Sequence, residues 1–348
     1  MSRHKVRKFA TALSILAICF CSNVPQPLFA CMDVAILSKE KTILATSRSM
    51  EFTYEMHSSV VKMPKNSASL IQRKEDTKWD NKYGYLFING LHIDYAIADG
   101  MNEKGLSFAA LWYPDAQYVS PNEVKGRKAV SNVRFGHWVL GNFDNINDLK
   151  TALKDIAIVN ESVEGKVFTL HYVIHDADGK SIVIEYDKGK MNVYDNVTNI
   201  VTNAPSYPWH VSNVDNYRYL IDRRQDNTSA KMLGGLPGDY SPASRFIRGV
   251  ALSHFIQEPE TQRDAIISAY HIINSVDIPH GAVLAYMGAD TPQVDYTQWT
   301  LLRDHINLSL FFKTYSELSM KEIKFADLDF TNGKIDHVKL HKYNNSDD

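Results

Sequence analysis

The stretch LFACMDVAIL, residues 28–37, contains Cys31, the last of the three cysteines in this 348-residue chain. From Met32 onward, MDVAILSKEKTILATSRSM predicts two short strands around a KEK turn. The other two cysteines, Cys19 and Cys21, lie in or beside the apolar run FATALSILAICFC, residues 9–21. A single cysteine therefore stands directly before the first expected strand, and its chemistry depends on what happens to the residues before it.

The segment before Cys31 is typical of a secretory signal peptide. Basic side chains gather within its first eight residues, its apolar run is too short to span a bilayer comfortably, and LFA ends it. We expect cleavage after Ala30, which predicts a periplasmic or secreted protein with a signal peptide over residues 1–30. The alternative is an N-terminal membrane anchor. No later apolar run is long enough to span, so we expect no stable membrane insertion after cleavage.

Cleavage after Ala30 would make Cys31 the first residue and the only cysteine of the mature chain. It could then form no intramolecular disulfide, and an odd cysteine in an exported protein indicates a reactive thiol or an intermolecular bond. A deprotonated thiol is a strong nucleophile. The α-amine of the same residue has an ordinary pKa of about 7.7–8.0, suitable for a general base at neutral pH.

Two other interpretations of Cys31 remain open. It can simply be a residue near a cleavage site, without a chemical role. Alternatively, LFAC is a lipobox, Cys31 carries lipid, and the protein is a membrane-tethered, catalytically idle binding protein. Lipoboxes favour a small or β-branched residue at the position of Phe29, which counts against lipidation.

Composition indicates an ordinary globular protein. The chain is 44% hydrophobic and 22% charged, with a formal net charge of −2. It has no basic stripe, so we expect no nucleic-acid partner. Residues 31–348 contain no repeat or linker, and we expect them to form a single domain.

Strand and helix patterns alternate in blocks along this domain. A long irregular surface loop is expected at 222–244, where glycine, proline and polar residues gather. Strand blocks followed by helix pairs predict an α+β fold with helices packed on antiparallel sheets. Strands are expected within 32–50, 95–114, 167–195 and 296–315, and helices within 130–159, 242–256 and 260–275.

Five motifs in order resemble the choloylglycine hydrolase family, which includes conjugated bile acid hydrolases and penicillin V acylases. They are Cys31 with SRSME, then ADGMNEKGL, VTNAPSYPWHV, GLPGDYSPASRFIR and DYTQWTLLRD. These enzymes are cysteine N-terminal nucleophile hydrolases. The resemblance implies a four-layer αββα sandwich, two antiparallel sheets flanked by helices, and hydrolysis of a non-peptide linear amide C–N bond without a cofactor.

The resemblance also implies a set of catalytic residues. Cys31 matches the nucleophile, and Arg48 matches an arginine beside its thiol. Glu51 stands where the family usually has an aspartate that holds the α-amine, so this chain keeps the charge on an arm one methylene longer. Asn203 matches an asparagine whose side chain helps to form the oxyanion hole. Arg245 matches a second arginine near the nucleophile.

Trp112 departs from the bile acid hydrolases, many of which have an asparagine at this position. A tryptophan there is similar to the Gram-negative penicillin V acylases, and Phe52 stands where that branch often has another tryptophan. Both aromatics are expected to bind substrate, although both could be ordinary core residues. The implied substrate is a small acyl amide: penicillin V, an N-acyl homoserine lactone, or a glycine- or taurine-conjugated bile acid.

Two further features carry weaker expectations. The resemblance to bile acid hydrolases implies a homotetramer, but those enzymes use a loop between the positions of Asn203 and Arg245 in tetramer assembly. This interval is shorter here, so the sequence leaves the oligomeric state open. His171 and His175 can share one face of a strand, but two histidines without a third ligand are more often structural. We expect no bound metal.

Overall fold

The computed structural model describes residues 31–74, 77–221, 233–285, 291–317, 319–331 and 333–338. The expected signal peptide, residues 1–30, lies outside the described residues, and cleavage after Ala30 stays a prediction. None of the described helices is long and apolar enough to cross a membrane.

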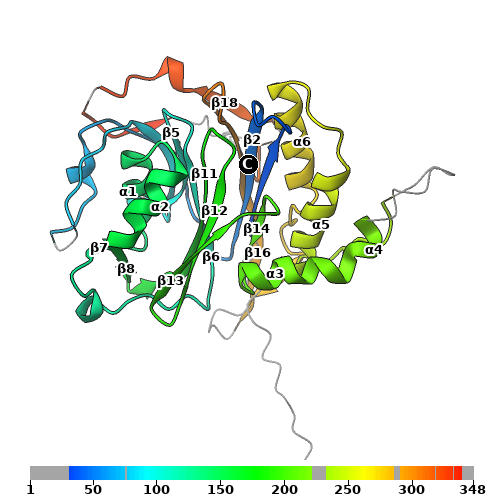
Figure 1. Ribbon diagram of the computed structural model, residues 1–348, viewed down its shortest axis with the longest axis horizontal. Coiled ribbons are helices and arrows are strands. Elements are labelled where there is room, and N and C mark those ends of the chain that lie inside the picture. Colours follow the sequence, from blue (N-terminus) through cyan, green and yellow to red (C-terminus); the bar gives the residue numbers. More distant parts are fainter. Residues whose placement is uncertain are drawn as a thin grey trace, which may run out of the picture.

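Two antiparallel sheets lie face to face in the centre of the molecule (Figure 1). The sheet that contains the first strand after Cys31 is called sheet I, and the other sheet II. In order across sheet I the strands are β14 (Ile200–Thr202), β1 (Met32–Leu37), β2 (Leu44–Phe52), β16 (Gln293–Asp304), β17 (Ser309–Thr314) and β18 (Lys321–Lys324), with β15 (Val283–Ala285) also paired to β16.

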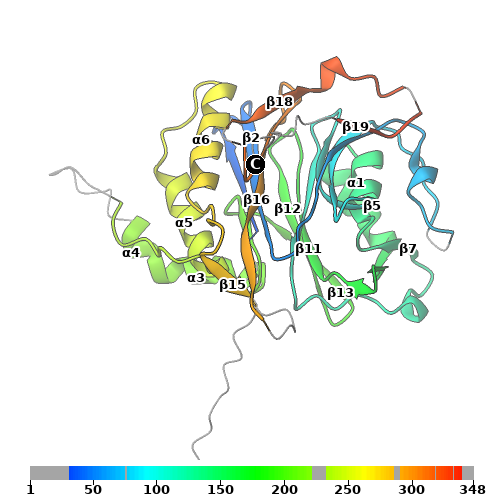
Figure 2. The same cartoon turned by 180° about the vertical axis from the view of Figure 1, so that it is seen from behind.

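Sheet II is formed largely by the middle of the chain. Its order is β13 (Lys190–Asp195), β12 (Ser181–Asp187), β11 (Leu170–His175), β6 (Ser107–Trp112), β5 (Ile93–Asn102), β4 (Tyr85–Gly90), β3 (Val60–Met63) and β19 (Asp336–Val338). Figure 2 shows the last part of the chain crossing from β18 in sheet I to β19 in sheet II, so the C-terminal segment ties the two sheets together along one edge.

Helices cover the outer faces of both sheets (Figure 1). On sheet I, α5 (Pro242–Phe255) packs on β14 and β1, and α6 (Gln262–Asn274) packs on β1, β2 and β16. On sheet II, α1 (Phe135–Asn142) packs on β5 and β6, and α2 (Ile146–Ala152) adds Ile146 and Leu149 to the same core. The layers are helix, sheet, sheet, helix, which confirms the expected αββα sandwich.

Smaller elements complete the described chain. A short parallel pair joins β7 (Lys128–Ser131) to β8 (Ile156–Val159), and β9 (Ser162–Val163) pairs with β10 (Lys166–Val167). Beyond β14 come α3 (Tyr207–Asn213) and α4 (Arg218–Ile221). Single 3₁₀ turns occupy Ala68–Leu70, Pro121–Glu123, Leu153–Asp155, Val214–Tyr217 and Phe325–Asp327.

Local sequence explains where the helices on sheet I begin. Ser241 caps α5 by accepting the N–H of Ser244, and Pro242 occupies the first turn. Thr261 and Asp264 form a capping box at the start of α6. Within α5, Gly249 leaves room for the Met32 side chain, because a Cβ there would lie 2.2 Å from Met32 Cε.

Residues 130–159, which were expected to be helical, form strands at both ends of this range. Its helices are α1 and α2, but Val130 and Ser131 end β7, and Ile156–Val159 form β8 parallel to it. The β-branched residues of IAIV fit a buried strand better than a helix, and all four are buried there. Of the expected surface loop, residues 222–232 lie outside the described residues, and 233–241 form neither helix nor strand.

Candidate active site

Alternation along β2 decides which side chains can meet Cys31. Arg48, Met50 and Phe52 point between the two sheets, whereas Ser49 and Glu51 point toward the helix layer, because successive strand residues face opposite sides. Every residue of β2 is buried. Cys31 directly precedes β1, which lies between β2 and β14, so its thiol and its nitrogen can reach different groups.

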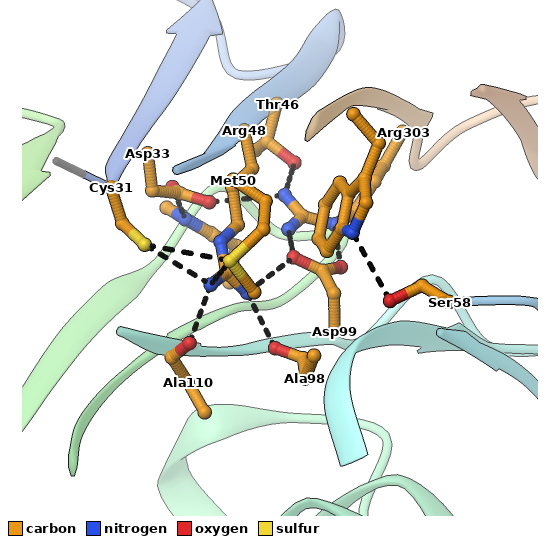
Figure 3. Close-up of polar contacts among 12 residues, drawn as sticks. Cys31, Asp33, Thr46, Arg48, Met50, Ser58, Ala98, Asp99, Ala110 and Arg303 are labelled. Atoms are coloured by element: carbon orange, nitrogen blue, oxygen red, sulfur yellow. Dashed lines mark hydrogen bonds and ion pairs between the residues drawn. The ribbon is translucent and has the colours of Figure 1, made fainter. Parts of the chain in front are cut away.

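The thiol of Cys31 faces Arg48. Cys31 is 2% exposed, and its Sγ lies 3.7 Å from Arg48 Nη2 and 3.7 Å from Met50 Sδ (Figure 3). A third contact, also 3.7 Å, joins Sγ to the backbone oxygen of Glu51. A guanidinium beside a sulfur atom can pair with the thiolate, which is the nucleophilic form.

Arg48 is held by the backbone of sheet II. Its Nη1 donates to Ala98 O at 2.5 Å, and its Nη2 donates to Ala110 O at 2.5 Å. Nη1 also lies 3.2 Å from Asp99 Oδ2. Arg48 is fully buried, so its charged head crosses the space between the sheets in a fixed position.

A chain of buried charges continues from Arg48, and the sequence interpretation did not identify it. Asp99 accepts Arg303 Nε on Oδ1 at 2.9 Å, and Arg303 Nη2 donates to its Oδ2 (Figure 3). Arg303 Nη1 also lies 3.1 Å from Asp33 Oδ2. Burial raises the pKa of Asp33, but His175, 2.7 Å away, and Arg303 together outweigh it, so this pKa lies below its usual value.

The nitrogen of Cys31 meets a different group. It donates to Asn203 Oδ1 at 2.5 Å, and the same oxygen accepts Arg245 Nη2 at 3.2 Å. Asn203 Nδ2 donates to the backbone oxygen of Trp112 at 2.8 Å. Asn203 follows β14, whose Thr202 pairs with Met32, and this pairing places it beside Cys31.

Glu51 lies in a buried polar cluster that is linked to Asn203 through Arg245. Its Oε1 accepts Thr297 Oγ1 at 2.6 Å, its Oε2 accepts Ser49 Oγ at 3.2 Å, and Arg245 Nη1 lies 3.9 Å away. Burial raises the pKa of Glu51 to about 8, despite Arg245. Cys31 N donates to Asn203 in this arrangement, so a contact between Glu51 and a free α-amine stays a prediction.

Asp295 is a second carboxylate near Arg245 that the sequence interpretation did not single out. It is fully buried, and within the described residues its carboxylate oxygens have no hydrogen-bond partner beyond a weak contact with the backbone of Tyr296. Burial raises the pKa of Asp295 to about 7, with Arg245 acting in the opposite direction.

An apolar pocket opens onto Cys31. The rings of Phe52, Trp112 and Phe168 line it, with centroids 6.0–6.3 Å apart in each pair. Met50, Met56 and Leu170 add further apolar surface. Among the lining side chains, only those of Cys31 and Arg48 carry a thiol or a charge.

The structure thus brings together all the site residues expected from sequence. Arg48, Glu51, Asn203 and Arg245 surround Cys31 directly or through one neighbour, and Trp112 and Phe52 line its cavity. His171 and His175 are used otherwise: the first lies 3.3 Å from Glu185, the second 2.7 Å from Asp33. In the part of the chain that the structure describes, no group of three or more metal-ligating side chains gathers.

The chain is similar in sequence to known proteins. The sequence model of the linear amide C–N hydrolases, choloylglycine hydrolase family, matches residues 31–339. The chain is 31% identical over 328 residues to a bile salt hydrolase/transferase of Clostridium perfringens, covering 90% of this chain and 97% of that protein. It is 24% identical over 364 residues to a penicillin V acylase of Pectobacterium atrosepticum, covering 95% and 91%.

Structural similarity extends over the same region. A crystal structure of a mutant conjugated bile acid hydrolase from Clostridium perfringens matches with a TM-score of 0.77 at 30% identity, covering 90% of this chain and 97% of that one.

Proposed function

Because the chain belongs to the choloylglycine hydrolase family of linear amide C–N hydrolases, we propose that it is an exported enzyme that cleaves a small acyl amide through Cys31. The chain is an amidohydrolase. The rest of the proposal depends on the two environments of Cys31. Its sulfur faces the Arg48 guanidinium and an apolar cavity, and its nitrogen donates a hydrogen bond to Asn203.

The first step is activation of the thiol by the residue's own amine. A peptide nitrogen is not basic, so cleavage after Ala30 must come before catalysis. The free amine takes the thiol proton, and Arg48 stabilises the resulting thiolate from 3.7 Å. The thiolate attacks the substrate carbonyl carbon, and a tetrahedral oxyanion forms.

Collapse of this intermediate completes the acylation. The protonated amine of Cys31 returns its proton to the leaving nitrogen, the C–N bond breaks, and the acyl group remains on sulfur as a thioester. Water then attacks the thioester with the same amine as base, which releases the carboxylic acid and the thiol. Asn203 Nδ2 carries two protons, of which one is donated to Trp112 O, so the other can donate to the oxyanion.

The cavity favours an acyl group without polar substituents. Its aromatic wall of Phe52, Trp112 and Phe168 suits a phenoxyacetyl ring or a slim alkyl chain through stacking and apolar burial. Hydroxyl groups of a bile acid would be buried there with few groups able to accept or donate a hydrogen bond. We therefore place penicillin V and N-acyl homoserine lactones above glycine- and taurine-conjugated bile acids as substrates.

A hydrolysis panel tests this ranking. The purified chain beginning at Cys31 is assayed with penicillin V, a straight-chain N-acyl homoserine lactone, glycocholate and taurocholate. We expect higher kcat/KM for the first two. A tenfold preference for a bile acid conjugate, about 1.4 kcal/mol, reverses the ranking and makes bile acid hydrolysis the better proposal.

Export and the state of Cys31 are tested by intact-mass measurement on the protein from its native cell fractions. A chain that begins at a free Cys31 in the periplasm or medium supports an exported N-terminal nucleophile. A diacylglyceryl adduct on Cys31 would instead support a lipid-anchored binding protein, because the adduct blocks the thiol. Sedimentation of the same sample tests the possible homotetramer.

A further inference from the structure

Asp99 is the point at which the buried charges of the two sheets meet. It lies on β5 of sheet II, whereas Arg48 and Arg303 lie on β2 and β16 of sheet I. All three side chains are fully buried, and Figure 3 shows the contacts that join them. Asp99 presents two carboxylate oxygens to three arginine nitrogens: Arg303 Nε and Nη2, and Arg48 Nη1.

The division of these contacts is unequal. Arg303 takes both oxygens of Asp99 in a two-pronged contact, while Arg48 has one contact at 3.2 Å. Most of the Asp99 charge is therefore matched by Arg303. The other strong contacts of Arg48 are the neutral carbonyls of Ala98 and Ala110, so its positive charge remains only partly neutralised on the side that faces Cys31 Sγ.

Stabilisation of the fold is a weak reason for burying these charges between the sheets. Replacing buried ion pairs by apolar residues is often neutral or stabilising, and the surrounding cluster between the sheets is apolar. A long, flexible arginine side chain, however, must be fixed if its Nη2 is to stay beside one sulfur atom. Arg303 opposes Thr46 in the β2–β16 pairing and also binds its hydroxyl at 2.8 Å, which fixes Arg303 in turn.

We propose that Asp99, clamped by Arg303, is a positioning residue for catalysis: it holds the Arg48 guanidinium in place beside the Cys31 thiol. This inference rests on the proposed function, in which Cys31 is the nucleophile. Asp99 does not line the substrate cavity and touches neither the thiol nor the cavity space, so it acts through Arg48.

The sign of the effect separates positioning from a simple charge effect. Asp99 is negative, so if it acted only through its field, Asp99→Asn would favour the thiolate and lower the pKa of the Cys31 thiol. Positioning predicts the opposite. An asparagine offers one acceptor and one NH₂ where Asp99 offers two acceptors. With its NH₂ in place of Oδ2, which accepts from both Arg303 Nη2 and Arg48 Nη1, Arg48 loses its only carboxylate contact and is held by the carbonyls of Ala98 and Ala110 alone.

The experiment uses the chain that begins at Cys31, in which Cys31 is the only cysteine. Iodoacetamide alkylation is followed as a function of pH, and kcat and KM are measured with the best substrate of the panel. For Asp99→Asn we expect a higher thiol pKa, a kcat lower by about tenfold to a hundredfold, and KM within about threefold of the parent.

Arg303→Lys is the second variant, since it keeps the charge but cannot form the two-pronged contact. It covers the case in which Asp99→Asn fails to fold, and it is expected to shift thiol pKa and kcat in the same direction. Glu161→Gln is the matched control. Glu161 forms a buried two-pronged contact with Arg134, 2.8 Å for each prong, away from the thiol, and its loss should lower thermal stability without changing the thiol pKa.

A double-mutant comparison gives the decisive readout. In an Arg48→Met background, Asp99→Asn should cause no further loss of kcat, because the residue through which it acts is already gone. The inference is overturned if a folded Asp99→Asn or Arg303→Lys protein has a kcat within about twofold of the parent value and a thiol pKa within about 0.3 unit of it, roughly the scatter of such comparisons. It is also overturned if the Asp99→Asn loss is the same with and without Arg48. Activity in Cys31→Ala would instead refute the proposed function, while the alkylation result would still report on Arg48.

Discussion

Asn203 accepts the N–H of Cys31 at 2.5 Å, although the two residues lie 172 positions apart in the chain. The antiparallel pairing of β14 with β1 creates this contact. Because Thr202 opposes Met32, Asn203, which follows Thr202, lies beside Cys31, which precedes Met32. Once Cys31 has a free amine, the same oxygen can accept one of its protons and orient the nitrogen relative to the thiol. In the proposed mechanism Asn203 then orients the base and, through Nδ2, donates to the oxyanion.

Asn203→Ala should therefore impair catalysis more than binding. We expect kcat to fall by about 10²–10³-fold, the usual effect of losing an oxyanion-hole donor, with a smaller change in KM. Steady-state kinetics on the processed chain measures both. Asn196→Ala is the matched control, since Asn196 is also a buried asparagine after a strand, bonded to Ser181 and Tyr207. Equal losses of kcat in the two variants would contradict a chemical role for Asn203.

Cys31→Ala should abolish turnover and leave the fold intact. The side chain is small and stands at the start of β1, so its truncation removes little apolar contact, and we expect the free energy of unfolding to change by no more than about 1–2 kcal/mol. Cys31→Ser should retain at most trace activity, because a hydroxyl is a poorer nucleophile at neutral pH. More than a few per cent of parental kcat in folded Cys31→Ala would place the nucleophile elsewhere.

Glu51 should make the unprocessed chain less stable as pH rises. Its pKa is about 8 in the fold and 4.5 ordinarily, so between these values the unfolded chain releases a proton that the folded chain keeps. Unfolding is favoured across this window, by on the order of 5 kcal/mol for complete ionisation. Glu51→Gln cannot ionise and should flatten the slope of unfolding free energy between pH 5 and 8.

Denaturant titration at each pH measures this slope. The pKa of Asp295 is also raised, to about 7, so Asp295 should cause a smaller share of the fall in unfolding free energy with pH. This share should persist in Glu51→Gln and disappear when Asp295→Asn is added. Glu258→Gln is the control, because Glu258 is an exposed partner of Lys39 outside this cluster. An unchanged slope in Glu51→Gln would show that Glu51 is already ionised at neutral pH.

Trp112→Asn should narrow the preference for aromatic or straight-chain acyl groups. The substitution opens the wall formed with Phe52 and Phe168 and adds a polar group to the cavity. We expect the ratio of kcat/KM between penicillin V and glycocholate to fall by about tenfold, since discrimination lies in transition-state binding. Trp209→Asn, at a half-exposed tryptophan on α3, should leave the ratio unchanged. An unaltered ratio in Trp112→Asn would remove Trp112 as a specificity residue.

Much of the fold and of the site could be predicted from the sequence. Strand alternation and helix caps located β1, β2, β5, β6, α5 and α6, because those signals are local. The strand β8 was missed because IAIV continues a helical pattern, and only its partner β7 makes it a strand. Contacts between sheets carry no such local signal.

The charges around Arg48 illustrate the second limit. Arg303 follows Trp299 and Leu301 at alternate positions of β16, so a cation next to two apolar residues on one face was visible in the sequence. Its partners were not, since Asp99 and Asp33 come from strands of different sheets. Glu51 shows the converse: its spacing of three from Arg48 already places the two on opposite faces of β2, which agrees with their separate environments.

The most direct test of Cys31 as an N-terminal nucleophile compares two forms of one chain. One begins at Cys31, and the other retains residues before it through a junction that cannot be cleaved, with both forms verified by intact mass. With penicillin V or an N-acyl homoserine lactone as substrate, we predict that kcat/KM of the extended form is lower by at least about 10³-fold, because its Cys31 nitrogen is an amide and cannot take the thiol proton. Equal turnover by the two forms would contradict the mechanism.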